Sequence, residues 1–118
     1  MVTIESIAQS ALMKNNLDTR SLVQDFLRTD PEISEIPRPQ ISDYTTLAIA
    51  AALLELFAFR QNKKAPTWTA DIGGVTEPIF LVRSATKMKR LRELCLQESP
   101  EPLRKRQFFA PPDYLDFV

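Results

Sequence analysis

Histidine is absent from the 118 residues of this chain, and cysteine occurs only once. Without an imidazole, the chain lacks the His of a Ser-His-Asp triad, the usual His ligands of zinc and the common neutral-pH acid–base group. Because Cys95 has no second cysteine to pair with, an internal disulfide is excluded. We therefore expect a non-enzymatic protein with no cofactor and no metal. Carboxylates are present, but no two of them form a recognisable catalytic pair: examples are Asp25, Glu32, Glu35, Asp43 and Glu55. A magnesium site made only of carboxylates is the alternative left open.

Glycine is also scarce, with two residues against nine prolines. This balance favours helices joined by stiff connections over a sheet with tight glycine turns. Long hydrophobic runs are missing as well, because Glu55 interrupts the longest one, at residues 47–59. The first five residues lack the basic flank and apolar core of a signal peptide. We expect one domain over residues 1–118, in the cytoplasm and not in a membrane.

The apolar periodicity predicts an all-α fold, a compact bundle of about five helices around one long central helix, with Pro-rich connecting loops. The central helix is expected at about 43–62, where apolar residues occupy nearly every side. The other helices are expected at about 3–13, 18–28, 84–98 and 99–106, with Thr3, then Asp18 or Thr19, then Ser84 or Thr86 as N-caps and Pro100 at the first position of the last helix.

Other segments carry weaker patterns. Residues 29–41 and 65–69 are expected to be extended around their prolines. Residues 79–82 are apolar enough for a short strand or a buried extended segment, but we expect no sheet, because one strand has no partner. The helix at 84–98 is expected to bury Met88, Leu91, Leu94 and Cys95, and the tail to fold back through Tyr114, Leu115, Phe117 and Val118.

The net charge of zero hides an uneven distribution. Residues 1–62 carry five basic and eight acidic side chains, whereas residues 83–118 carry eight basic and five acidic ones. Such asymmetry is typical of an interaction surface, or of two halves that attract each other. The candidate partner-binding residues are the lone tryptophan and a basic-aromatic cluster near the C-terminus: Trp68, Arg104, Lys105, Arg106, Phe108 and Phe109.

Each candidate also has a structural interpretation. Trp68 can plug the end of the long helix, and the two phenylalanines can belong to the core. The basic triplet can pair within the chain with Glu98, Glu101 or Asp113. The leading functional hypothesis is a protein-binding module whose partner has an acidic surface. A homodimer formed through the apolar long helix is a further possibility.

Nucleic-acid binding by the basic C-terminal half is the alternative function. Lys87, Lys89, Arg90 and Arg92 precede the triplet, and Phe108 and Phe109 could stack bases of a single strand. A helix-turn-helix at the N-terminus, with Arg20 and Gln24 reading bases, is less favoured, because that half of the chain is acidic.

Three short motifs occur in order: Ala65-Pro66-Thr67-Trp68, Glu77-Pro78-Ile79-Phe80, and a Ser-Pro…Arg-rich…Phe ending over 98–109. In this order and spacing, residues 22–118 resemble a family of small bacterial proteins of uncharacterised function. The resemblance implies a toxin–antitoxin or adaptor role, since members are often encoded beside a nucleotidyltransferase-like or other toxin-like partner. It brings no catalytic residues to this sequence.

Overall fold

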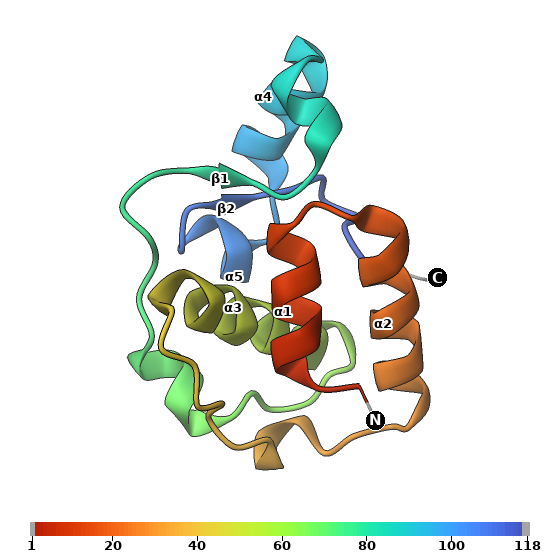
Figure 1. Ribbon diagram of the computed structural model, residues 1–118, viewed down its shortest axis with the longest axis vertical. Coiled ribbons are helices and arrows are strands. Elements are labelled where there is room, and N and C mark those ends of the chain that lie inside the picture. The colour runs from red at the N-terminus through yellow and green to blue at the C-terminus, as the bar shows by residue number, and fades with distance from the viewer. Residues whose placement is uncertain (1, 117–118) are drawn as a thin grey trace.

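One helix forms the centre of the fold, and the rest of the chain surrounds it. The computed structural model describes residues 2–116, and Figure 1 shows α3 (Tyr44–Arg60) lying behind α1. Twelve of the 17 residues in α3 are buried. Its many alanines allow neighbouring elements to approach closely from several directions. Asp43 caps the helix by accepting the Thr46 amide at 3.2 Å, and the predicted central helix is confirmed.

The two N-terminal helices pack together on this core. They are α1 (Ile4–Leu12), capped by Thr3 as predicted, and α2 (Asn16–Arg28). The prediction that Asp18 or Thr19 caps the second helix was wrong. Asn15 does so, accepting the Asp18 amide at 3.3 Å. The helix starts earlier because Lys14 takes the left-handed conformation, with φ of 59°, that turns the chain.

The linker after α2 and the loop after α3 are connected by Trp68, whose indole N–H donates to the Ile36 carbonyl. The linker contains one short 3-10 helix, η1 (Ile33–Glu35), whose Ile33 is buried. The loop was expected to be extended over residues 65–69, but from Thr67 it forms another 3-10 helix, η2 (Thr67–Asp71). The reason is local, because the Thr69 amide and hydroxyl both donate to the Pro66 carbonyl, at 3.2 and 2.8 Å.

A small parallel sheet corrects the expectation that residues 79–82 have no strand partner. Strand β1 (Ile79–Phe80) pairs with β2 (Phe108–Phe109), with Ile79 opposite Phe108. The Ile79 amide donates to the Gln107 carbonyl at 2.8 Å. The phenyl rings of Phe80 and Phe109 lie 5.6 Å apart. Such a short pair, separated by almost 30 residues of sequence, leaves no periodic pattern to detect.

The C-terminal helices are shorter than predicted. They are η3 (Arg83–Thr86), α4 (Lys89–Glu98) and α5 (Glu101–Arg104). Neither Ser84 nor Thr86 caps α4, because the chain first forms the η3 turn and Met88 takes the N-cap position. The expected burial of Met88 was also wrong, since 57% of it is exposed.

Figure 1 shows the reason, because α4 stands out from the globule beyond the sheet. Only Cys95 is buried in α4, while Leu91 and Leu94 are half-buried. The last helix also differs from expectation: Pro100 is the N-cap of α5 and Pro102 lies at the second helical position.

The predicted fold class is confirmed: the chain is a compact, mostly helical globule with about five helices and one two-stranded sheet, measuring 39 × 30 × 24 Å. Tyr114 is buried and Leu115 half-buried, while Phe117 and Val118 lie outside the described residues. Within residues 2–116, no helix has both the length and the apolar character needed to cross a membrane. The same residues contain no group of three His, Cys, Asp or Glu side chains placed to hold a metal.

Candidate protein-interaction site

The basic triplet is divided between the core and the surface. Arg106 is only 2% exposed and forms two hydrogen bonds with the Glu55 carboxylate, at 2.7 and 3.0 Å. It also donates to three backbone carbonyls, those of Thr69 at 2.8 Å, Pro102 at 3.1 Å and Ile72 at 3.2 Å. All five guanidinium N–H groups are thereby used. This side chain connects α3, η2 and the chain after α5, and it is removed from the candidate surface.

Glu55 is the acidic centre of this network. Its side chain is 14% exposed and also pairs with Lys105, whose Nζ lies 2.9 Å from Oε1. Burial opposes ionisation of Glu55, but hydrogen bonds from Arg106 and Lys105 outweigh it and lower the pKa of the carboxyl. The pairing expected with Glu98, Glu101 or Asp113 was wrong, because the ion pairs of the triplet among residues 2–116 go to Glu55.

The remaining candidates have separate places. Arg104 and Lys105 are exposed, and Arg104 donates to the Gln97 carbonyl at 2.8 Å. Phe108 is fully buried and Phe109 is 8% exposed, so both belong to the core in this fold. Trp68 is half-buried, and its indole donates to the Ile36 carbonyl at 2.9 Å.

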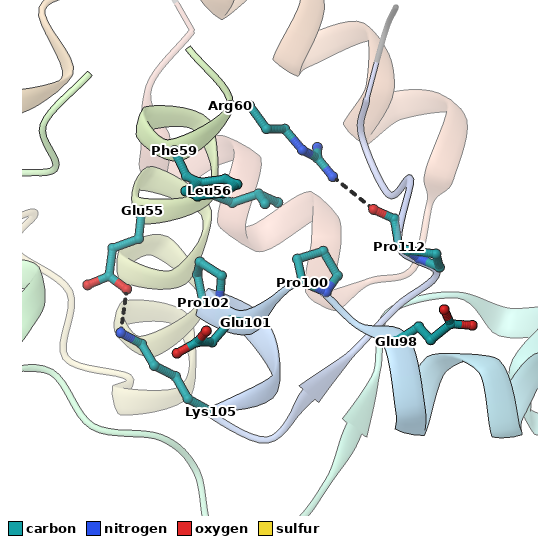
Figure 2. Close-up of a pocket in the computed structure, with 10 residues that line it drawn as sticks. All are labelled: Glu55, Leu56, Phe59, Arg60, Glu98, Pro100, Glu101, Pro102, Lys105 and Pro112. Atoms are coloured by element: carbon teal, nitrogen blue, oxygen red, sulfur yellow. Dashed lines mark hydrogen bonds and ion pairs between the residues drawn. The ribbon is translucent and has the colours of Figure 1, made fainter. Parts of the chain in front are cut away.

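Of the six predicted residues, Lys105 alone lines the groove between the C-terminal end of α3 and α5 (Figure 2). The groove has a volume of about 460 Å³. Its apolar part consists of Leu56, Phe59, Pro100, Pro102 and Pro112. Phe59 is 80% exposed, at the end of a helix that is otherwise largely buried. We refer to this feature as the α3–α5 groove.

Local sequence chemistry builds the walls of the groove. The buried Ser99 accepts the Ala110 amide at 2.9 Å and thereby anchors the junction between α4 and α5. Arg60 holds the tail, donating to the carbonyls of Tyr114 at 2.5 Å and Pro112 at 3.3 Å. Burial lowers the pKa of Arg60, while Asp116 and Asp113 act in the opposite direction. The prolines limit backbone freedom, so the groove is largely preorganised.

Sequence reasoning missed Phe59, Glu98 and Glu101 as members of one site. Phe59 lies in a helix that is apolar on nearly every side, so the sequence pattern does not distinguish it from the core residues of that helix. In the structure it is exposed near the C-terminal end of the helix. The two glutamates were considered as partners for the basic triplet. No protein-family model, curated protein or solved structure matches this chain, so the resemblance to small bacterial proteins stays a prediction.

Proposed function

We propose that this protein is a protein-binding module that holds an extended segment of a partner in the α3–α5 groove. The observation that carries the proposal is Phe59, an aromatic side chain left 80% exposed at a groove walled by prolines. Covering an exposed phenyl ring releases water from apolar surface, and buried aromatic anchors dominate the energy of many interfaces. Lys105, one of the predicted partner-binding residues, lines this groove and pairs there with Glu55.

The shape of the groove supports an extended segment. A groove whose walls are preorganised binds a peptide at a lower entropic cost, because the groove itself need not reorganise. Figure 2 shows the rings of Pro100 and Pro102 between α3 and the tail that carries Pro112. The floor of the groove is α3, a helix packed on most of its sides, so Phe59 lies on a rigid element.

Site-specific photo-crosslinking tests the proposal. A photoreactive phenylalanine analogue replaces Phe59 in one preparation and Gln9, an exposed residue of α1 outside the groove, in the control. Irradiation in host cells should give a discrete adduct from position 59 that is absent from position 9. The same adduct from both positions, or none from position 59, contradicts docking in the groove.

A second candidate function is nucleic-acid binding by the segment 83–92, which runs from η3 into α4. It carries Arg83, Lys87, Lys89, Arg90 and Arg92 with no acidic residue between them, and none of the five forms an ion pair with the described part of the chain. Because Phe108 and Phe109 are in the core, binding would rest on phosphate contacts and not on base stacking.

Fluorescence anisotropy with single- and double-stranded oligonucleotides tests this candidate. Three neutralised phosphates predict a slope of log affinity against log salt of roughly −3. The substitutions Lys87→Gln, Lys89→Gln and Arg90→Gln together should abolish binding. The matched control replaces the exposed Arg28, Arg38 and Lys64 and should bind normally. No binding at about 50 mM salt, or equal loss in both variants, contradicts the candidate.

A further inference from the structure

We propose that the segment held in the α3–α5 groove is cationic, with a lysine or arginine whose aliphatic part lies on Phe59 and the prolines and whose charge meets Glu98 and Glu101. This inference rests on the proposed function and adds the chemistry of the partner. It follows from the charges that line the groove and from which of them are already neutralised within the chain.

The cations at the groove are all engaged. Arg106 and Lys105 both pair with Glu55, and Arg60 donates to two carbonyls of the tail. Two further carboxylates, Asp113 and Asp116, act electrostatically on Arg60. The lining itself contains three carboxylates, those of Glu55, Glu98 and Glu101, against two cations, Arg60 and Lys105, so its excess negative charge is one. Of the three lining carboxylates, Glu98 and Glu101 form no ion pair with any described residue.

The positions of these two glutamates define the path of the occupant. Both are exposed and both line the groove. Figure 2 shows Glu101 beside Pro102 and Glu98 on the other side of Pro100. A chain that crosses Pro100 thus passes a carboxylate on each side of the ring. Long basic side chains suit this surface, because their methylene groups cover apolar atoms while the charged end stays near carboxylates.

The same charges disfavour other occupants. An anionic peptide or a phosphate backbone would face the excess negative charge with no unengaged lysine or arginine in the lining to receive it. A purely apolar segment would cover Phe59, but it would also displace water from the carboxylates of Glu98 and Glu101 without offering them a partner. Such desolvation of an unpaired charge costs free energy. A cationic segment satisfies both parts of the groove.

Selection from a display library of random 12-residue peptides, with the full chain as the target, tests the inference. At about 50 mM salt, the selected peptides should carry a net positive charge, with lysine or arginine beside proline or aliphatic residues. The affinity of a synthesised peptide is then measured by fluorescence anisotropy. Phe59→Ala should weaken it about tenfold, since anchor residues commonly contribute more than 1 kcal/mol.

Neutralisation of the two carboxylates gives the decisive comparison. The double variant E98Q/E101Q should bind the peptide about three- to tenfold more weakly at low salt, and this loss should shrink at about 500 mM salt. The matched control E32Q/E35Q removes two exposed carboxylates from the linker and should bind like the wild type. Circular dichroism checks that each variant is folded.

The outcomes separate the two claims. One outcome is a set of neutral or acidic peptides that need Phe59 and bind E98Q/E101Q as tightly as the wild type. This result overturns the inference of a cationic partner but leaves the proposed docking in the groove standing. Failure to select any peptide, or binding that Phe59→Ala does not change, overturns the proposed function itself. Cationic peptides that lose affinity in both groove variants and keep it in E32Q/E35Q establish the inference.

Discussion

Replacement of Arg106 by methionine tests whether the Glu55–Arg106 network holds the fold together. Methionine keeps most of the length and apolar stem of arginine but removes the charge and all five hydrogen bonds. The carboxylate of Glu55, 14% exposed, then loses the stronger of its two cationic partners. Three backbone carbonyls lose a donor at the same time.

The expected cost follows from the burial of the pair. Removing one partner of a buried ion pair typically costs about 3–5 kcal/mol, because the other charge stays buried and unpaired. Lys105 still contacts Glu55, so we expect the lower end, about 3 kcal/mol. With a urea m value of about 1.5 kcal/mol/M, the unfolding midpoint should fall by about 2 M.

Urea unfolding followed by circular dichroism at 222 nm measures this change. Arg104→Met is the control, since Arg104 is exposed and makes one hydrogen bond to a carbonyl, and it should change stability by less than about 0.5 kcal/mol. The double variant E55L/R106M should recover part of the loss, because an apolar pair leaves no buried charge. If Arg106→Met costs no more than Arg104→Met, the network does not stabilise the fold.

Three further predictions concern single residues. The pKa of Glu55 is lowered in the folded state, so its contribution to stability is present above the unfolded pKa of about 4.3. This contribution is lost as the pH falls through the folded pKa. Acid titration followed by unfolding should therefore reduce the stability of Glu55→Gln less steeply than that of the wild type. Gly74→Ala should lower the thermal midpoint clearly, whereas Gly73→Ala should lower it little. A Cβ at position 74 would lie 2.5 Å from the Cα of Arg106, while one at position 73 would meet only the Tyr44 hydroxyl at 3.4 Å. Cys95 is buried and burial raises the pKa of its thiol, so a disulfide reagent at pH 8 should react with it only as fast as the protein unfolds; immediate labelling would contradict its burial.

Local sequence chemistry was sufficient for the helices with strong patterns. The central helix and the Thr3 cap of the first helix could both be predicted, because they depend on residues within one or two turns. The proline-rich linker was predicted as extended, but it contains the 3-10 helix η1 at Ile33–Glu35, so that prediction was only partly right. The start of α4 could not be predicted, since the competing 3-10 turn at Arg83–Thr86 uses similar residues and differs only in which carbonyl the amides reach.

The candidate site depended on contacts between distant residues. The sequence by itself determined that the chain is helical, that it has no histidine chemistry and that its C-terminal half is basic. Only the tertiary structure decided that Arg106 is internal and Lys105 external, because that depends on Glu55, 51 residues earlier in the chain. It also placed Phe108 and Phe109 in a strand opposite Ile79 and Phe80. Burial and charge compensation are properties of neighbours in space, and for these residues the neighbours lie far away in the sequence.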